Sequence, residues 1–485
     1  PLTEEEKRQP DRIKKALDRV RQDYDNQYVT EWTDFFRDID VRVPQNNLEA
    51  IDEFKVLATS DWPYARLLKA LRDNTQFEKV AEEKADDADK EPKGGVVDQL
   101  RQRARRKIDS KLRTPGASQL LAGAGVADAV RADPVPKAFE KMVDFGFPKP
   151  PKEGEPPPPS GLGGYISDIE QLAAEMQVLE EGPPNGDTKK ATQLFEKAVA
   201  DSEKRLLSLD ATGQRLMRDL LLNPLRQSYK AMLKSAGGAA SGLWEVTVWP
   251  PYKDTIMGRY PFNSASRRDA SFEDFVAFYR PKDGVLWGFY ETYLKDFHMK
   301  VGHKFVPATH LQGAQPAKRY TPFNPNLYNC LERSDEISDA LFHGGADPKL
   351  SFNVSLTTVS PIVSEIVFDL DGVQRVYKNE KEYWRGFDWP GPNGPTGASI
   401  RIKGAGGLDE EIRRDGPWGF WRLLEAGRHT AEKESDKVFR IEWEMSAPPV
   451  IVKMQIRPQR KNHPFPLNFF RNSNCPQSIG DTFGG

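Results

Sequence analysis

Residues 258–262 read GRYPF, and residues 274–284 read DFVAFYRPKDG. Two further short motifs follow downstream, WPGP at 389–392 and GPW at 416–418. All four segments are rich in aromatic residues, proline and glycine, and they hold almost no nucleophile, general base or metal ligand. Residues of these types define packing and turns. The four motifs therefore predict a folded scaffold rather than a catalytic site.

Length and charge limit the classes of protein to consider. The chain has 485 residues, which predicts roughly two to four domains. Its 70 basic and 72 acidic residues leave a net charge of -2, which argues against nucleic acid or another polyanion as a general partner. No apolar run approaches the roughly 20 residues that span a bilayer, so we expect a soluble chain. The first nine residues are charged and lack both methionine and an apolar signal core, so we expect the sequence to start inside a longer protein.

The first third of the chain has the apolar period of amphipathic helices. One stripe runs over residues 13–39, and its spacing continues over residues 48–54. A stripe this regular predicts a helical neighbour. Ser60-Asp61 stands where the N-cap of the next helix is expected, and the polar run at 81–93 predicts a solvated connection. We predict a helical bundle or stalk over residues 1–147.

Proline and glycine dominate residues 148–164, which predicts a linker or exposed loop, with a ligand for a proline-recognition domain as the alternative. Helical periodicity returns over residues 166–179 and 191–222, and we expect Pro224 to interrupt it. We predict a mainly helical domain with an irregular, aromatic-rich segment over residues 165–345.

From residue 350 onward the apolar period changes to two, which is typical of antiparallel strands with one buried face. Asp371-Gly372 predicts a tight hairpin, and Pro417 and Gly427 mark the two ends of one short helix. We predict a β-sandwich over residues 346–485, and hence an α+β multidomain fold. The predicted apolar faces are Phe352, Val354 and Leu356; Ile362, Ile366, Phe368 and Leu370; Phe439, Ile441, Trp443 and Met445; and Val450, Val452, Met454 and Ile456.

Cys330 and Cys475 are the only cysteines. Two cysteines are too few for a disulfide-dense scaffold or a four-cysteine zinc site. We interpret them as two unpaired thiols, with a long-range disulfide in an oxidising compartment as the alternative. The sequence alone does not decide between the two.

The sequence offers little for catalysis or metal binding. His298, His303 and His310 are spaced by five and seven residues, which matches no common zinc pattern, so we interpret them as packing or surface histidines. The chain lacks GxxxxGK[ST] and the G-x-S-x-G elbow. The charge run at 409–415 and the pair Arg267-Arg268 read as solvated segments. We predict no catalytic, cofactor-binding or metal-binding residue. The remaining histidines, His343, His429 and His463, are scattered.

Trp384, Phe387 and Trp389 lie in a segment rich in glycine and proline. They either cap the sandwich core or offer aromatic contact area to a partner. A periplasmic module that binds glycan or peptidoglycan, stacking sugars on Trp384 and Trp389, is therefore an alternative function. An envelope hydrolase is a further alternative.

Taken in order, the aromatic and proline motifs resemble the C-terminal region of the IcmF/TssM family. The resemblance is strong over residues 244–481 and weaker at the N-terminus, where Tyr28-x-x-x-Trp32-x-x-Phe35 fits the family's helical region. The matching series is Gly258-Arg-Tyr-Pro-Phe262; Asp274-Phe275 with Phe278-Tyr279, Pro281 and Gly284; Phe368-Asp-Leu-Asp-Gly372; Trp389-Pro-Gly-Pro392; Gly416-Pro-Trp418 with Phe420 and Arg422-Leu-Leu424; and Pro464-Phe465 with Cys475-Pro476.

The resemblance implies the periplasmic segment of the large inner-membrane component of a type VI secretion system. It implies that an outer-membrane lipoprotein, TssJ, docks on loops of the β-domain within residues 346–485. It also implies that TssL associates with a membrane and cytoplasmic portion outside this sequence, and that several copies form a ring-like channel. The implied role is a scaffold, with neither enzymatic activity nor a cofactor. The proline-rich insert and Trp421 depart from the family pattern, so the docking residues stay unassigned.

Overall fold

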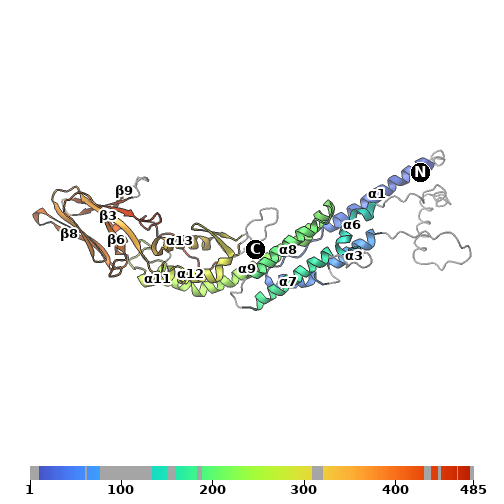
Figure 1. Cartoon of the computed structure of the whole chain (residues 1–485), viewed down its shortest axis with the longest axis horizontal. Coiled ribbons are helices and arrows are strands. Elements are labelled where there is room, and N and C mark those ends of the chain that lie inside the picture. The colour runs from blue at the N-terminus through green and yellow to red at the C-terminus, as the bar shows by residue number, and fades with distance from the viewer. Residues whose placement is uncertain are drawn as a thin grey trace, which may run out of the picture. The chain divides into compact units, whose positions relative to one another are not determined.

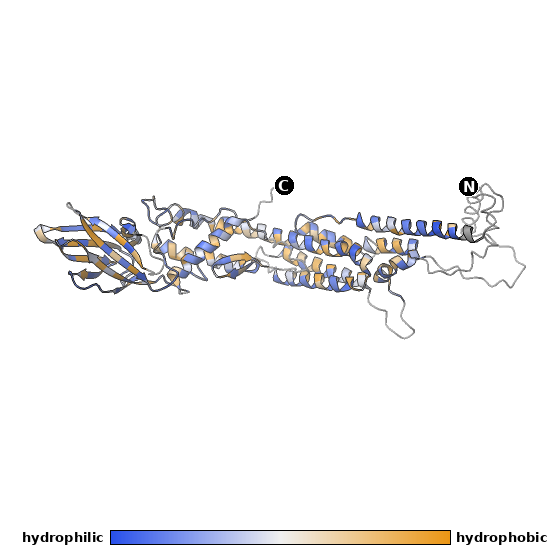
Figure 2. Cartoon of the chain, turned by 90° about the horizontal axis from the view of Figure 1, so that it is seen from above, coloured by the Kyte–Doolittle hydropathy of each residue, from blue (hydrophilic) through white to orange (hydrophobic). Residues whose placement is uncertain are grey.

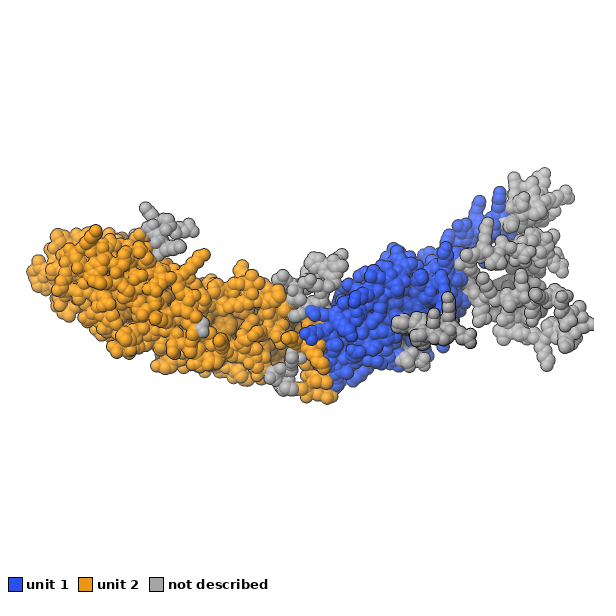
Figure 3. Space-filling model, in the orientation of Figure 1, with its two compact units in different colours: residues 1–177, 193–229 blue, residues 178–192, 230–485 orange. Residues whose placement is uncertain are grey.

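The computed structural model describes residues 10–59, 63–76, 134–149, 160–182, 188–308, 321–343, 345–430, 438–445, 449–466 and 468–480. The chain divides into two compact units (Figure 3). Unit 1 comprises residues 1–177 and 193–229, and unit 2 comprises residues 178–192 and 230–485. The predicted connection at 81–93 and most of the predicted proline-rich linker lie outside the described residues.

Unit 1 is helical in its described part (Figure 1). Its core is aromatic, and the Phe195 ring lies 6.1 Å from the Phe54 ring and 5.2 Å from the Tyr229 ring. The predicted N-terminal helical region is confirmed. Its helices are α1 (Pro10–Arg37), α2 (Asn47–Leu57), α3 (Tyr64–Thr75), α6 (Pro134–Gly146), α7 (Gly161–Glu181), α8 (Lys189–Leu206) and α9 (Ala211–Thr247), of which α7, α8 and α9 also contribute residues to unit 2.

Two helix starts in unit 1 use different chemistry. At the start of α2, the side chain of the N-cap residue Asn46 accepts a hydrogen bond from the Glu49 backbone N–H (2.9 Å), and the Glu49 carboxylate accepts one from the N–H of the preceding residue, Gln45 (3.1 Å). The predicted N-cap of α3 at Ser60-Asp61 is wrong. The N-cap is Pro63, which makes no side-chain hydrogen bond and whose ring fixes φ near the helical value.

The predicted helix over residues 191–222 is two helices, because α8 ends at Leu206 and α9 begins at Ala211. Asp210 caps the new start by accepting a 2.7 Å hydrogen bond from the Gly213 N–H. The predicted interruption at Pro224 is also wrong, because α9 continues through it. Proline lacks the N–H that would bond to the Leu220 carbonyl. In this structure the Tyr64 hydroxyl of α3 donates to that carbonyl instead, at 2.5 Å.

We expect Tyr64→Phe to lower the free energy of unfolding of unit 1 by about 1–3 kcal/mol, because the buried Leu220 carbonyl loses its donor. Urea unfolding followed by far-UV circular dichroism measures the change. Tyr24→Phe is the matched control, because the Tyr24 side chain is exposed on α1. Equal stability of Tyr64→Phe and the wild type would show that the hydroxyl does not substitute for the missing proline N–H.

Unit 2 begins with short helical segments and ends in strands. Asn324 is the N-cap of α13, and its side chain accepts hydrogen bonds from two backbone N–H groups of the first turn. The helical segments are α10 (Trp249–Pro251), η2 (Tyr252–Ile256), α11 (Phe272–Tyr279), α12 (Val285–Phe289), η3 (Tyr290–Leu294), η4 (Lys295–Phe297), α13 (Pro325–Phe342), η5 (Ala405–Gly407) and α14 (Gly419–Glu425).

Eleven strands form three antiparallel sheets in the described part of unit 2. Strands β1 and β2 form a hairpin, a five-stranded sheet has the order β6-β3-β11-β10-β9, and a four-stranded sheet has the order β5-β4-β7-β8. The strands are β1 (His298–Val301), β2 (Lys304–Pro307), β3 (Leu350–Thr358), β4 (Val363–Leu370), β5 (Val373–Tyr377), β6 (Arg385–Trp389), β7 (Gly397–Gly404), β8 (Asp409–Asp415), β9 (Arg428–Thr430), β10 (Phe439–Met445) and β11 (Val450–Pro458).

The two larger sheets pack face to face as the predicted β-sandwich. The Phe368 ring of β4 lies 5.0 Å from the Phe387 ring of β6, across the gap between the sheets. Hydrophobic and hydrophilic residues alternate along the strands (Figure 2). The alternation buries one face of each central strand, as the period of two predicts.

One predicted apolar face needs a correction. The period of two predicts Ile362 on the same face as Ile366, Phe368 and Leu370, but Ile362 lies before β4 and is exposed. A register shift between Val363 and Glu365 adds one residue to β4. Such a bulge changes the inward parity, so Val363 takes the buried place.

The predicted hairpin and helix are confirmed. Leu370 pairs with Val373 across Asp371-Gly372, and both turn residues have positive φ, 55° and 84°, which glycine adopts without strain. The predicted short helix is α14, which begins at Gly419, two residues after Pro417. A Cβ atom at Gly419 would lie 2.1 Å from the Arg414 carbonyl oxygen, so only glycine fits there.

One buried apolar cluster runs through unit 2 from Ala240 to Ile479 and includes residues of its helices and of both large sheets. The predicted division between residues 345 and 346 therefore crosses a continuous core. The compact units are instead divided within α7, α8 and α9, after Gln177, Thr192 and Tyr229. The domain boundaries drawn from composition stay a prediction.

Candidate partner-binding surface of the β-sandwich

The aromatic motifs of distant sequence segments meet at one end of the sandwich. The Trp421 ring lies 4.5 Å from the Trp389 ring and 5.6 Å from the Trp418 ring. Phe272 and Phe275 of α11 contact Trp389 and Trp418 at 5.7 and 5.1 Å. All three tryptophans are buried. We call Trp389, Trp418 and Trp421 the tryptophan cluster, and the end of the sandwich that holds them the base end.

Polar contacts fix the helical segments to the base end. The Trp418 indole N–H donates to the Ala270 carbonyl at 2.8 Å. Arg422 of α14 pairs with Asp269, and its guanidinium lies 3.8 Å from the centre of the Tyr260 ring. These residues join the GPW segment to the GRYPF segment. The base end is therefore covered by the helical part of its own unit.

Asp371, in the turn between β4 and β5, connects two loops of the base end by hydrogen bonds. Its buried carboxylate accepts hydrogen bonds from the backbone N–H groups of Gly391 (2.9 Å), Thr396 (2.7 Å) and Gly397 (3.0 Å). Burial raises the pKa of Asp371, and the three N–H groups oppose that rise. The carboxylate thus ties the hairpin turn to the WPGP loop, which gives Asp371 a structural role.

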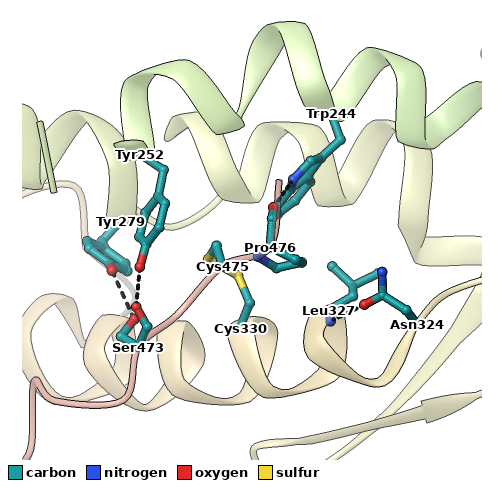
Figure 4. The surroundings of a disulfide bond; sticks show 9 residues. All are labelled: Trp244, Tyr252, Tyr279, Asn324, Leu327, Cys330, Ser473, Cys475 and Pro476. Carbon is teal, nitrogen blue, oxygen red and sulfur yellow. Dashed lines mark hydrogen bonds between the residues drawn. A yellow bond between two sulfur atoms is a disulfide. The ribbon is translucent and has the colours of Figure 1, made fainter. Parts of the chain in front are cut away.

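A disulfide links Cys330 of α13 to Cys475, 145 residues later (Figure 4). The interpretation of these cysteines as unpaired thiols is therefore wrong, and the alternative pairing is correct. Sequence periodicity carries no information on contacts between segments so far apart, which is why the sequence left the question open.

The segment around Cys475 is also held by hydrogen bonds (Figure 4). The Trp244 indole N–H donates to the Pro476 carbonyl at 2.8 Å. The Tyr252 hydroxyl donates to the Ser473 carbonyl, and the Tyr279 hydroxyl lies 3.1 Å from the Ser473 hydroxyl. We call residues 473–480 the C-terminal strap, because they connect α13 to α9 and η2 by these contacts.

The opposite end of the sandwich, which we call the distal end, carries the loops 359–362, 378–384 and 405–408. The antiparallel register places it there, because β3 begins beside Trp389 at the base end and ends at Thr358. Val359 is 65% exposed and Ile362 is 40% exposed. Exposed aliphatic side chains on adjoining loop positions favour contact with another protein. The distal loops are the candidate docking surface within residues 346–485.

The predicted sugar-stacking pair is not available as a pair. Trp389 is buried in the tryptophan cluster, so its faces are covered by protein. Trp384 is partly exposed, and the Arg457 guanidinium lies 4.1 Å from its ring centre. Phe387 is buried between the sheets. Capping of the sandwich core therefore accounts for Phe387 and Trp389.

Of the three clustered histidines, the structure describes two, and these have different partners. His298 is buried, and its Nδ1–H donates to the Leu294 carbonyl at 2.8 Å, which leaves Nε2 unprotonated among aromatic rings. His303 Nδ1 lies 2.7 Å from Asp335, and His310 lies outside the described residues. Burial lowers the pKa of His298 to about 4. His298 is thus a packing histidine, as interpreted from its spacing.

The charged segments are solvated as expected. Residues 409–415 form β8, an exposed edge strand whose charges disfavour pairing with another sheet. Arg267 and Arg268 are exposed in the turn after GRYPF. In the part of the chain that the structure describes, no group of three or more His, Cys, Asp or Glu side chains is arranged to hold a metal ion. Within the same ranges, no helix is long and apolar enough to cross a membrane.

Three family models match the chain. Residues 352–458 match the type VI secretion protein IcmF C2-like domain, and residues 236–347 match the type VI secretion protein IcmF helical domain. Residues 2–76 match an IcmF-related model described as intracellular multiplication and human macrophage-killing. The chain belongs to the IcmF/TssM family. The C2-like match covers most of the sandwich, and the helical match covers the segments that pack on its base end.

One curated relative and two solved structures are also similar to the chain. The chain is 26% identical over 424 residues to the type VI secretion system component TssM1 of Pseudomonas aeruginosa, covering 84% of this chain and 35% of that protein. It therefore spans about a third of the length of this curated relative. A solved structure titled type VI secretion system membrane core complex has the same fold, with a TM-score of 0.61 and 16% identity over 96% of this chain and 85% of that chain. A second, titled type VI membrane complex, has a TM-score of 0.59 and 18% identity at the same coverage.

We expect the double substitution Cys330→Ala and Cys475→Ala to lower the free energy of unfolding of unit 2 by about 2–5 kcal/mol, because the disulfide restricts the unfolded chain and holds the C-terminal strap. Guanidinium unfolding followed by tryptophan fluorescence reports mainly on unit 2, which holds eight of the ten tryptophans. Titration of thiols in the denatured, unreduced wild type should give none. Two titratable thiols would contradict the pairing.

We expect acid to destabilise unit 2 through His298. The folded state keeps this imidazole neutral down to about pH 4, whereas the unfolded chain protonates it below its ordinary pKa of 6.5. Stability is therefore lost as the pH falls through this window, by about 2 kcal/mol from pH 7 to pH 5. His298→Phe should remove that part of the pH dependence of guanidinium unfolding. The control His343→Asn changes an exposed histidine at a left-handed position that asparagine tolerates, and it should keep the wild-type slope.

Proposed function

We propose that this chain is the periplasmic segment of a TssM-type component of a type VI secretion membrane complex, where it acts as a scaffold between the inner membrane and an outer-membrane lipoprotein. Membership of the family and the fold shared with solved type VI membrane complexes support this role. The proposed partners are TssJ at the β-domain, TssL at a portion outside this sequence, and further copies of the chain. Several copies together would line the channel across the envelope.

The observation that carries the periplasmic placement is the Cys330–Cys475 disulfide. Disulfides persist in oxidising compartments such as the bacterial periplasm and are rare in the reducing cytosol. Both cysteines are buried, so the linkage belongs to the folded core of unit 2 rather than to an exposed thiol pair. In the periplasm the two cysteines would be oxidised, and the chain would therefore reach the structure described above.

The distal loops are the proposed contact with the lipoprotein. At the base end, Trp389 and Trp418 are covered by the segment of the same unit that carries Ala270 and Phe272. The distal loops carry the exposed Val359 and Ile362. A docking site needs accessible apolar area surrounded by polar groups, and of the two ends of the sandwich the distal end offers it.

We expect the whole chain to bind a soluble, lipid-free form of the TssJ lipoprotein from the same secretion cluster with a Kd of about 10 µM or tighter, which is ordinary for a small specific interface. Val359→Glu with Ile362→Glu should weaken binding at least about tenfold, because both charges would be desolvated. Biolayer interferometry measures both.

The control Val301→Glu places the same charge on the exposed β1–β2 hairpin and should bind like the wild type. Unchanged binding by the double variant would move the docking site away from the distal loops. A wild-type chain that does not bind at about 100 µM, far above the expected Kd, would overturn the proposed bridging role.

A further inference from the structure

An apolar groove of about 750 Å³ opens on unit 1. It lies between the C-terminal turns of α1, the connection that follows, α2 and the first turns of α3. Aromatic and aliphatic side chains form its walls, and Phe35 and Val56 stand more than half exposed. The residues of its apolar wall are Trp32, Phe35, Ile39, Val41, Pro44, Val56, Leu57, Pro63, Leu67 and Ala70.

The groove is acidic. Asp40, Glu49, Asp52 and Glu53 line it, against the two bases Arg42 and Arg66. Both carboxylate oxygens of Glu53 are buried and have no hydrogen-bond partner in the described part of the chain. Burial raises the pKa of Glu53 to about 7, with Arg42 opposing the rise. A buried carboxylate without a partner is unfavourable, and a cation placed in the groove would relieve it.

The N-terminal half of α1 has the opposite chemistry. Residues 12–21 read RIKKALDRVR, with five basic residues and one acidic residue. Two residues of the apolar stripe predicted to need a helical neighbour stand exposed on this part of α1, Val20 at 66% and Tyr24 at 64%. Further along α1, Phe36 is buried and the Tyr28 hydroxyl donates to the Asn74 carbonyl at 3.0 Å. The helix is thus held within unit 1 at its C-terminal half.

We propose that the groove of one copy receives the N-terminal part of α1, up to Tyr24, from a second copy of this chain, with Val20 and Tyr24 against the apolar wall and Lys15 or Arg19 against Glu53. Charge complementarity selects this occupant, because an acidic apolar groove and a basic amphipathic helix carry matching surfaces. Both surfaces exist on every copy, so the contact needs no further protein.

The two surfaces differ, and therefore the contact is heterologous. A heterologous contact joins copies head to tail and closes into a ring when the rotation between copies permits. This inference rests on the proposed scaffold function, in which several copies line a channel, and it adds the contact that would join neighbours. The isolated chain should associate weakly, since a contact of this size is small. Anchoring of neighbouring copies in one membrane would raise their effective concentration.

A photo-crosslinking residue at position 20 tests the contact in the whole chain. Mixing unlabelled and ¹⁵N-labelled chains at about 100 µM, a concentration suited to weak contacts, separates links between copies from links within one. We expect links between copies to the groove peptides that contain Phe35, Val56 or Leu67. Links confined to one chain, links between copies that do not reach the groove, or no link at all would each overturn the inference.

Complementation tests the head-to-tail arrangement. A helix variant, Val20→Asp with Tyr24→Asp, keeps its groove, and a groove variant, Val56→Asp, keeps its helix. Each alone should self-associate at least about tenfold more weakly in sedimentation velocity, and an equimolar mixture should form dimers, because one intact contact remains. Glu53→Gln should weaken association and reduce its salt dependence.

Leu207→Asp is the control, because Leu207 is exposed and does not line the groove. Circular dichroism of every variant verifies folding. A mixture no more dimeric than its components would overturn the inference. Binding of TssJ by the same variants should stay at the wild-type level, so loss of self-association with retained lipoprotein binding separates a failure here from a failure of the proposed function.

Discussion

The contact among Trp389, Trp418 and Trp421 is the constraint on which unit 2 depends. The three residues come from β6, from the turn before α14 and from α14 itself, and they meet only when both sheets have their registers. Each indole N–H in a buried cluster needs an acceptor, and Trp418 finds it in Ala270, at the end of the GRYPF turn. The cluster therefore couples sandwich, α14 and helical segments into one core, which explains why a single apolar cluster runs through the unit.

The periodic parts of this fold could be predicted from the sequence, and the corrections arise where contacts between distant residues override local pattern. The alternation over β3, β10 and β11 sets their buried faces without outside help. Pro224 was expected to end a helix, but a tyrosine from another helix supplies the missing donor. The period of two predicts Ile362 on the buried face, because the alternation of apolar and polar residues does not reveal the β-bulge in β4. Both corrections are caused by contacts between residues far apart in the sequence, which the local propensity of a segment does not include.

The candidate site shows the same limit. The aromatic residues of the short motifs that carried the family resemblance are packed inside unit 2, many of them at the base end, so these motifs identify the fold and not the docking surface. The exposed Val359 belongs to a loop without a distinctive motif. The pairing of Cys330 with Cys475 depends on the C-terminal strap reaching α13, a contact across 145 residues. The contacts of Trp244 and Tyr252 hold the same strap. They are tertiary contacts, so the sequence alone could not predict the disulfide from them.

Unit 1 retains two local conflicts that its own packing leaves in place. Val20 and Tyr24 expose apolar area along α1, and Glu53 buries a carboxylate without a partner in the described residues. Either feature alone reduces the stability of an isolated chain. A basic amphipathic helix in the groove removes both at once, because the cation satisfies the carboxylate while the apolar stripe loses contact with water. The exposed apolar residues of α1 and the buried carboxylate of Glu53 are both unfavourable in the single chain, and one contact between copies would stabilise both. Such exceptions to the rules of stability are typical of functional surfaces.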